Sequence, residues 1–289
     1  MGGTDYFVSK LILWLWRLKT KPFLYAVARS VYRVCGLKVV LKKPLSKILG
    51  VDYAHAAMAV HYLGAKPGSC LVVGCNRGRE CGYFIKLGAS YVDGVDIIDD
   101  IGSDYSRAGV MYYKLSAENM NTIRSDFYDI VYSYATMEHI GRIDLAFSQM
   151  CRVARPGGII YSVAGPLWNS RYGHHKQDFF KDYPWIHLRM SKEEIVDYCK
   201  AKHIYDPAGT DMKHHIEYML NPSFFNKLFS KKYIEVCGAL RGVDIIRNEL
   251  VFEEEKGLAP NIYAQLMPKG YARRELLAMV HIFIGRKNG

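Results

Sequence analysis

Two groups of residues have types and spacings that could do chemistry. One is a glycine turn, Gly74-Cys75-Asn76-Arg77-Gly78, which directly follows the apolar run Leu71-Val72-Val73. Backbone without a side chain can approach a ligand closely at such a turn. The other group consists of histidines, the side chains best suited to accept a proton near neutral pH: His139, His174, His175 and His187. The sequence therefore predicts a ligand-binding turn and a set of candidate proton acceptors.

The glycine turn alone does not identify its ligand. It lacks the Gly-x-Gly-x-x-Gly of a dinucleotide site and the Gly-Lys-Ser/Thr of a phosphate-binding loop, so NAD and ATP are disfavoured. About 20 residues later, Asp96 ends the next apolar stretch, where a carboxylate can accept hydrogen bonds from a ribose diol. Taken alone, the turn would equally suit a tight strand-to-helix connection without a ligand.

Alternating strands and helices must position these residues. Apolar stretches predict strands at residues 70–73, 91–97, 110–115, 128–134 and 158–164. Helical spacing occurs between several of them, at 79–87 and 143–153, and also before the first strand, at 53–63. Strands separated by helices indicate a parallel, doubly wound α/β sheet.

The second half of the chain is less regular. The capping pattern Ser191-Lys192-Glu193-Glu194 predicts another helix. Strands at 233–239 and 275–284 are expected to complete a mostly parallel sheet of seven strands, and residues 241–270 receive no assignment. We expect a helical extension at 1–50 and one domain at 51–289, with an insertion after the fifth strand at about 166–230, called the lid segment below.

The order of five motifs over residues 66–165 resembles that of class I S-adenosylmethionine-dependent methyltransferases of the type 11-like group. The motifs are Leu71-Val72-Val73-Gly74-Cys75-Asn76-Arg77-Gly78, Gly94-Val95-Asp96, Ser116-Ala117-Glu118-Asn119-Met120, Phe127-Tyr128-Asp129-Ile130-Val131-Tyr132-Ser133 with Met137-Glu138-His139-Ile140, and Arg152-Val153-Ala154-Arg155-Pro156-Gly157-Gly158. The resemblance implies a Rossmann-like fold and S-adenosyl-L-methionine as cofactor.

The resemblance also implies which residues bind the cofactor. The glycine turn would lie over the methionine part, Asp96 would bind the ribose, the adenine would lie beside the third motif, and the end of the fourth strand would line the sulfonium. These residues are Gly74, Cys75, Asn76, Gly78, Asp96, Ile97, Ala117, Glu118, Tyr132 and Ser133. Asn76 replaces a usual glycine, although asparagine tolerates left-handed backbone. Val72 replaces a usual acid and so removes one polar tether.

Methyl transfer needs an oriented acceptor and, for a hydroxyl, a base. The candidate bases are His139, His174 and His175. The start of the lid segment resembles the acceptor lids of bacterial glycan-modifying members, and aromatic planes can stack on sugars while polar groups read hydroxyls. The candidate acceptor residues are Trp168, Asn169, Tyr172, Trp185 and His187. Alternatively, these aromatic residues only seal the cofactor from water.

No metal site is predicted. The pairs His174-His175 and His214-His215 are adjacent in sequence, whereas an i, i+4 spacing would aim two rings at one ion, and carboxylate partners are not obvious. Seven cysteines without a CxxC pair indicate a reducing, cytoplasmic environment.

Positive charge is concentrated at the start of the chain. The 289 residues carry a formal charge of +11, and residues 1–50 hold ten Lys and Arg against one acid, Asp5. Residues 6–34 combine helical apolar spacing with tryptophans and cations, which predicts helices lying on the inner face of a membrane. The same pattern would also suit helices packed on the chain's own domain or on a second copy in a homodimer. No stretch is long enough to span a membrane.

The sequence thus predicts an S-adenosylmethionine-dependent methyltransferase that O-methylates a small-molecule, glycan or lipid-linked acceptor near the membrane. Two alternatives remain open. The charge would suit an RNA methyltransferase, but no Asn-Pro-Pro-Tyr motif is present and nucleic acid is disfavoured as a partner. The departures at Val72 and Asn76 would suit a catalytically degenerate binding or scaffold module of the same fold.

Overall fold

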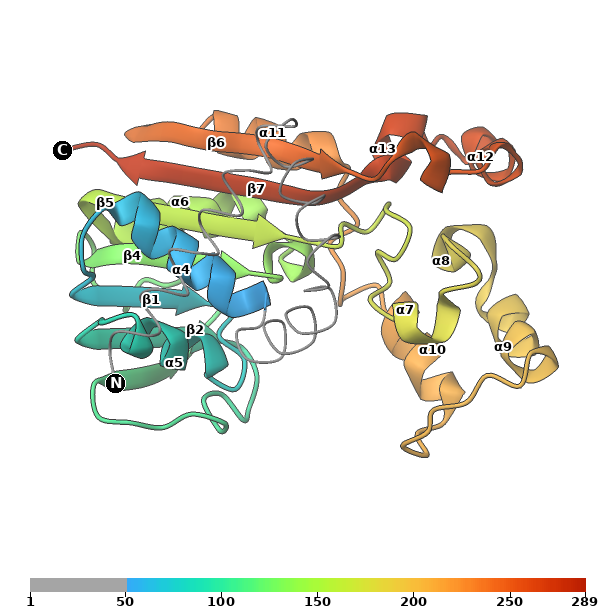
Figure 1. Ribbon diagram of the computed structural model, residues 1–289, viewed down its shortest axis with the longest axis horizontal. Helices are drawn as coiled ribbons and strands as arrows, with labels where there is room; N and C mark the ends of the chain where they lie inside the picture. The colour runs from blue at the N-terminus through green and yellow to red at the C-terminus, as the bar shows by residue number, and fades with distance from the viewer. Residues whose placement is uncertain (1–50) are drawn as a thin grey trace, which may run out of the picture.

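Seven strands form one sheet at the centre of the molecule. The computed structural model describes residues 51–289. The strands are β1 (Ser69–Val73), β2 (Tyr91–Asp96), β3 (Val110–Lys114), β4 (Tyr128–Tyr134), β5 (Ala154–Ala164), β6 (Val243–Phe252) and β7 (Ala278–Lys287). Their order across the sheet is β3-β2-β1-β4-β5-β7-β6 (Figure 1). Strands β1 to β5 pair in parallel, and β7 pairs antiparallel with β5 and β6. The predicted fold class is therefore confirmed.

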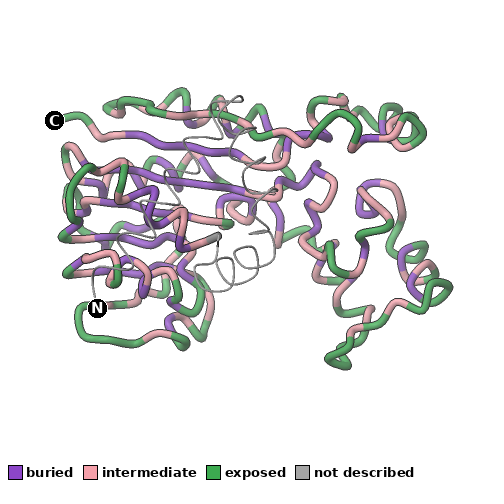
Figure 2. The backbone as a smooth tube through the Cα atoms, viewed as in Figure 1, coloured by how far each residue is buried: buried purple, intermediate pink, exposed green. Residues whose placement is uncertain are grey.

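Helices cover both faces of the sheet. On one face, α4 (Val51–Leu63) and α5 (Arg79–Lys86) share a core cluster with Cys70 and Val72 of β1. On the other, α6 (Ile143–Val153) and α11 (Ser230–Gly238) share a cluster with Leu71 and Val73. Alternate side chains of β1 thus enter opposite cores, which is why its sequence is apolar without a break. Figure 2 shows that the central strands are buried, whereas most of the connections between strands are exposed.

The chain order reverses beside β1. Strand β2 lies on one side of β1 and β4 on the other, so the connections after β1 and β4 diverge at the carboxyl edge of the sheet. In open α/β sheets, ligands bind beyond the carboxyl ends of the strands at this switch point. The glycine turn follows β1, and the short helix η1 (Met137–His139) follows β4.

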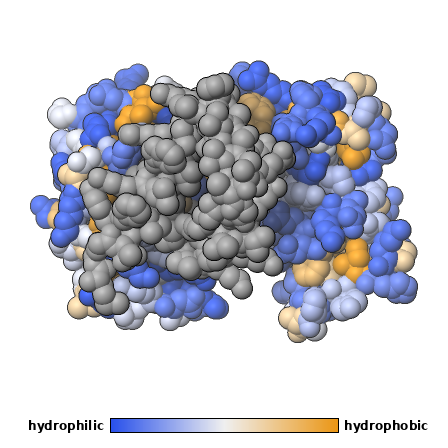
Figure 3. Space-filling view, viewed as in Figure 1, coloured by the Kyte–Doolittle hydropathy of each residue, from blue (hydrophilic) through white to orange (hydrophobic). Residues whose placement is uncertain are grey.

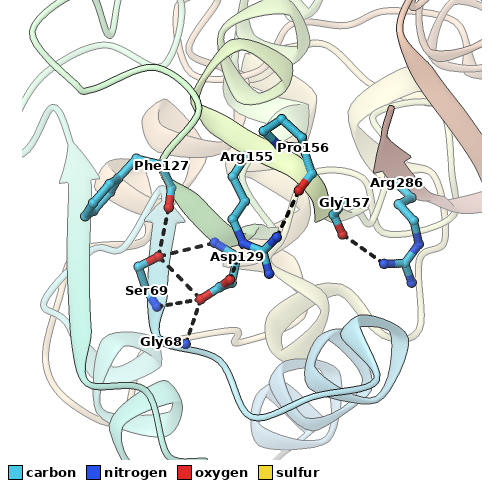
Figure 4. Close-up of polar contacts among 8 residues, drawn as sticks. All are labelled: Gly68, Ser69, Phe127, Asp129, Arg155, Pro156, Gly157 and Arg286. Carbon is cyan, nitrogen blue, oxygen red and sulfur yellow. Dashed lines mark hydrogen bonds and ion pairs between the residues drawn. The ribbon is translucent and has the colours of Figure 1, made fainter. Parts of the chain in front are cut away.

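At the amino ends of the strands, one carboxylate holds three neighbouring strands together. Asp129 Oδ2 accepts hydrogen bonds from the N–H groups of Gly68 (2.6 Å) and Ser69 (2.8 Å), and Asp129 Oδ1 accepts one from Arg155 Nε (Figure 4). Ser69 Oγ donates in turn to the carbonyl of Phe127 at 3.0 Å. The amino ends of β1, β4 and β5 are therefore cross-linked.

The lid segment forms helices beyond the carboxyl ends of the strands (Figure 1). They are α7 (Gln177–Phe180), α8 (Ile186–Arg189), α9 (Lys192–Ala201) and α10 (Met212–Leu220), and α9 begins with the predicted capping box at Ser191 and Glu194. These helices bury their own apolar cluster, which includes Phe180, Ile195 and Ile216. Helices α12 (Pro260–Leu266) and α13 (Arg273–Leu277) lie at the same end and pack on Trp168 and Trp185. Figure 3 shows a mainly hydrophilic visible surface, with hydrophobic patches on this helical region.

In the second half of the chain, one predicted strand was wrong and the other was shifted along the sequence. The strand predicted at 233–239 is helix α11, because Tyr233, Val236, Cys237 and Leu240 share one helical face and pack into the core. Residues 241–270, which received no assignment, contain the edge strand β6, the 3-10 helices η2 (Glu255–Gly257) and η3 (Met267–Lys269), and α12. The strand predicted at 275–284 begins only at Ala278, after α13.

The predicted helical extension at 1–50 and its membrane contact through residues 6–34 lie outside the described residues. Within residues 51–289, no helix combines the length and apolar character needed to cross a bilayer.

Candidate active site

The fold itself requires glycine at position 74 of the glycine turn, whether or not a ligand binds there. Gly74 has a positive φ of 75°, and a Cβ at this position would overlap the side chain of Thr136 beside η1. Asn76 has a φ of 50°, so asparagine adopts the left-handed conformation expected of it from the sequence. Cys75 between them is fully buried, and its neighbour Cys81, together with burial, raises the pKa of its thiol. Cys75 is therefore a neutral packing residue, and the turn presents its backbone.

Asp96 is fixed at the carboxyl end of β2, beside this turn. Its Oδ2 accepts a hydrogen bond from the N–H of Asn76 at 2.8 Å, and its Oδ1 accepts from Ile97 (2.7 Å) and Ile98 (3.3 Å). A carboxylate offers about four lone-pair positions, so further donors can still bind. The side chain of Ile97 is 68% exposed directly beside it. A fixed anion next to an exposed apolar side chain suits a ligand with hydroxyls and a flat apolar ring.

The remaining predicted cofactor residues differ in their burial and in their hydrogen bonds. Glu118 Oε1 accepts a hydrogen bond from the N–H of Arg142 at 2.9 Å, and Ala117 packs against the core. Tyr132 is fully buried under α4, with its ring stacked on Tyr161 at 5.6 Å. Ser133 is also fully buried, and its hydroxyl has no hydrogen-bond partner among the described residues. Tyr132 therefore contributes packing with its side chain, while Ser133 retains an unused polar group at the end of β4.

His139 and His175 come together from distant parts of the chain. Their ring centroids are 5.1 Å apart. His139 Nδ1 lies 2.8 Å from the carbonyl of Phe224, and His175 Nε2 lies 3.0 Å from that of Pro166. A carbonyl only accepts, so these nitrogens carry the protons and the opposite nitrogens keep free lone pairs. Burial lowers the pKa of His139 and lowers that of His175 to about 4, so both rings are neutral at neutral pH.

Glu138 completes a group of three with these histidines. One donor atom from each residue lies within 4.8 Å of the others. Glu138 is 1% exposed, and neither carboxylate oxygen has a hydrogen bond of standard geometry among the described residues. Burial raises the pKa of this carboxyl to about 8, against a smaller opposite effect of the nearby N–H groups of Glu138 and Gly165. Glu138 was not among the site residues predicted from the sequence, although the Glu-His pair after the fourth strand was a signal for it.

The lid segment holds this group in place. Asn226 Nδ2 donates hydrogen bonds to the carbonyls of Met137 (2.8 Å) and Ile140 (3.0 Å), on either side of Glu138. The N–H of Asn226 donates to the carbonyl of Glu138 at 3.0 Å. Phe225, next to it, packs against both histidine rings at 5.1 and 5.0 Å. Helix η1 is thus preorganised by residues far along the chain.

The third candidate base lies elsewhere. His174 is fully buried, its Nδ1 accepts a hydrogen bond from the N–H of Lys176 at 3.0 Å, and its ring packs on Phe180 and His187. Burial lowers the pKa of His174 to about 2 and that of His187 to about 4. The structure therefore places the ring of His174 in the lid interior and leaves His139 and His175 as the pair at the carboxyl edge.

The predicted acceptor residues are mostly interior. Trp185 is fully buried and its indole N–H donates to the carbonyl of Asn169 at 3.1 Å, while Trp168 is 7% exposed. Asn169 Nδ2 donates to Glu275 Oε1 at 3.0 Å. Tyr172 is partly exposed, and its hydroxyl donates to the carbonyl of Lys181. The burial of both tryptophans matches the alternative in which lid aromatics exclude water.

The sheet order, the glycine turn after β1 and the carboxylate fixed after β2 agree with the arrangement that the resemblance to class I methyltransferases implies. Residues 71–162 match the family model described as a methyltransferase domain. A stretch of 116 residues is 28% identical to sterol 24-C-methyltransferase ERG6B of Gibberella zeae, covering 36% of this chain and 30% of that protein. The match thus spans less than a third of the length of this curated relative.

Solved structures with a similar architecture include two methyltransferases. An S-adenosylmethionine-dependent methyltransferase from Mesorhizobium loti is 14% identical, with a TM-score of 0.48 and coverage of 82% of this chain and 100% of that chain. The 1,6-didemethyltoxoflavin-N1-methyltransferase of Burkholderia thailandensis, solved with S-adenosylhomocysteine, is 12% identical, with a TM-score of 0.45 and coverage of 94% and 90%.

Proposed function

We propose that this protein binds S-adenosylmethionine at the carboxyl edge of β1 and β2 and transfers its methyl group to an acceptor hydroxyl. The observation that carries this proposal is the Asp96 carboxylate, which three backbone N–H groups fix beside the glycine turn and the exposed Ile97. The domain family supports the same ligand.

The residues present fit this cofactor. Asp96 has lone pairs left for two ribose hydroxyls, and the exposed Ile97 offers an apolar surface to the adenine, with Ala117 and Glu118 proposed as its other contacts. In this proposal, the amino-acid part lies against the backbone of the turn from Gly74 to Gly78. When bound, the cofactor supplies an electrophilic methyl group on a sulfonium.

His139 and His175 are the bases of this proposal. Both rings are neutral at neutral pH, and each has one ring nitrogen without a hydrogen bond among the described residues. In the transfer, the acceptor oxygen bonds to the methyl carbon while the carbon–sulfur bond breaks, and its electron pair stays on sulfur. The hydroxyl proton passes to a free histidine nitrogen, and a general base of this kind contributes about 10²–10⁴-fold to the rate.

For the acceptor, we propose a glycan or lipid-linked molecule at the membrane surface. Ten cations among residues 1–50, interleaved with Trp14 and Trp16, support a position on an anionic membrane. Tyr172 and His175 are the lid residues whose partial exposure suits contact with a sugar. The matched relative is named for a sterol, a lipid acceptor, which also supports lipid chemistry.

The cofactor proposal is tested by calorimetric titration of the purified chain with S-adenosylhomocysteine. We expect Asp96→Ala to weaken binding at least about tenfold, or about 1.4 kcal/mol. Asp99→Ala is the matched control, because Asp99 lies three residues further on, with a 95% exposed side chain paired only with Lys114. Asp96→Asn and thermal unfolding of every variant separate lost contacts from lost folding. No binding by the wild type would instead favour the scaffold alternative.

The acceptor proposal needs a separate assay. Labelled S-adenosylmethionine would be incubated with the chain and sugar nucleotides, lipid-linked glycans, sterols, quinones or amines. We expect label in a hydroxyl of a glycan-containing acceptor. Label only in lipid, quinone or amine substrates would show that the glycan part of the proposal is wrong.

A further inference from the structure

We propose that Glu138, His139 and His175 bind one divalent transition-metal ion. The three donors come from η1 after β4 and from the loop after β5, and one donor atom of each lies within 4.8 Å of the others. Two imidazoles and one carboxylate form the donor set of many catalytic metal sites that keep open coordination positions.

Both histidines already have the orientation that metal ligands need. Ligating histidines almost always donate the second ring N–H to a carbonyl or carboxylate, which fixes the tautomer and aims the lone pair. Phe224 and Pro166 supply these carbonyls, at 2.8 Å from His139 Nδ1 and 3.0 Å from His175 Nε2. The lone pairs of His139 Nε2 and His175 Nδ1 remain, and neither nitrogen has a hydrogen-bond partner among residues 51–289.

Glu138 supplies the reason why a cation belongs here. Its side chain is almost completely buried, and both oxygens lack a hydrogen bond of standard geometry among the described residues. In the same part of the chain, no Lys or Arg forms an ion pair with it. A buried carboxylate without a partner is costly, and buried charges are normally paired or coordinate metals. A bound cation would replace the proton that otherwise neutralises this buried carboxyl.

The donor types select the ion. Imidazole ligands suit Zn²⁺, Fe²⁺, Cu²⁺ and Ni²⁺, whereas Ca²⁺, Mg²⁺ and Mn²⁺ prefer oxygen ligands, and Co²⁺ serves as a spectroscopic substitute for Zn²⁺. Three protein ligands leave at least one position for a ligand from solution. The site is therefore of the open, catalytic type.

The role of the ion rests on the proposed methyl transfer. Thr136 is the N-cap residue of helix η1, and its side chain packs against Gly74 of the glycine turn, so the group borders the proposed cofactor edge. An acceptor oxygen bound in the open position would lose its proton to solvent at a lower pH, because a divalent cation stabilises the oxyanion. With the ion present, the two histidine nitrogens are ligands, and the ion activates the hydroxyl in place of a histidine base.

The test measures metal binding directly. The full chain is freed of metal with a chelator and titrated with Co²⁺ and Zn²⁺, with calorimetry and the visible spectrum of Co²⁺ as readouts. We expect about one ion per chain and Co²⁺ bands typical of four- or five-coordinate sites. Glu138→Gln and His175→Ala should each weaken binding at least about tenfold. His214→Ala, which removes an exposed histidine of α10, is the matched control and should bind as the wild type does.

Two results would overturn the inference: a wild type that binds neither ion, or binding that both site variants retain unchanged. Thermal unfolding identifies a variant that fails to fold, and the other variant then decides. S-adenosylhomocysteine is titrated into the same samples with and without metal. Metal binding without cofactor binding would contradict the proposed function alone, and cofactor binding without metal binding would contradict this inference alone.

Discussion

Gly74 sits where the sheet, η1 and the proposed cofactor meet. Its φ of 75° and the overlap of any Cβ with Thr136 predict that Gly74→Ala is destabilising. Strain at positive φ costs about 1–2 kcal/mol, and overpacking adds about 1–3 kcal/mol. We expect the free energy of unfolding to fall by about 3 kcal/mol, measured by urea denaturation, together with loss of S-adenosylhomocysteine binding.

Gly64 provides the control for this substitution. It ends α4 with a φ of 77°, but open space surrounds its Cβ position. Gly64→Ala therefore carries only the backbone strain, about 1 kcal/mol. Equal losses in the two variants would show that contact with Thr136 has no role.

Residues differed in how far the sequence could predict them. Asp96 and Asn76 were predictable because the turn, the strand and the acid follow one another closely in the sequence, and their hydrogen bond joins neighbouring strands. The proximity of His175 to Glu138 could not be predicted, because it depends on how the lid segment folds back over the sheet. Trp185 was predicted to stack on an acceptor, but the structure buries it against residues of α8 and α12. The residues next to Trp185 in the sequence give no sign of this burial.

At the scale of elements, Asp129 joins the starts of three strands. Burial alone would raise the pKa of its carboxyl, but hydrogen bonds from Ser69, Arg155 and Gly68 outweigh this effect and lower it. A lowered folded-state pKa stabilises the fold above the unfolded value of about 3.9, and this contribution is lost as the pH falls through the folded pKa. We expect Asp129→Asn to lower the free energy of unfolding by about 2 kcal/mol at pH 7, with a smaller difference from the wild type near pH 3.

Denaturant unfolding at both pH values checks this prediction. Asp197→Asn is the control, because Asp197 is 77% exposed on α9 and should change stability by less than about 0.5 kcal/mol. An Asp129→Asn penalty that stays constant down to pH 3 would show that the charge of the carboxylate is not what fastens the strands.

Elements were predictable where burial left a regular pattern. The bounds of β4 and α6 agree with the sequence prediction, because β4 is covered on both faces and α6 has a clear helical stripe. Strand β6 lies at the sheet edge with most side chains at least partly exposed, so it lacks the apolar run that marks a strand. Helix α11 is short and its apolar residues lie close together in the sequence. Over so few residues, the apolar pattern cannot distinguish a helix from a strand.

For the whole molecule, we expect the position of the positive charges along the chain to decide membrane binding more than the net charge does. Ten of the 39 Lys and Arg lie within residues 1–50. We predict that the full chain sediments with vesicles of anionic lipid and that added salt weakens this binding, because screening shortens the reach of each charge. Each cation near the surface contributes about 1 kcal/mol, so the loss of Arg17, Lys19 and Lys21 alone would weaken binding about 100-fold, and reversing them to Glu should weaken it further.

The control for this prediction reverses three cations elsewhere. Lys200→Glu and Lys231→Glu, on the exposed surfaces of α9 and α11, with Lys256→Glu, change the net charge by the same amount. If this triple variant loses as much binding as the first, attraction is set by net charge and residues 1–50 have no special part.

The hydrogen bonds of Asn226 to η1 link the proposed cofactor side of the site to the proposed acceptor side. Through η1, the same residues that border the acceptor side also fix the turn packed against Gly74 on the cofactor side. We therefore expect a ligand that orders one side of η1 to reduce the ordering cost of a ligand on the other side, so that the two proposed binding events are cooperative. Because linkage is reciprocal, the factor by which the proposed cofactor changes the affinity for the acceptor must equal the factor by which the acceptor changes the affinity for the cofactor.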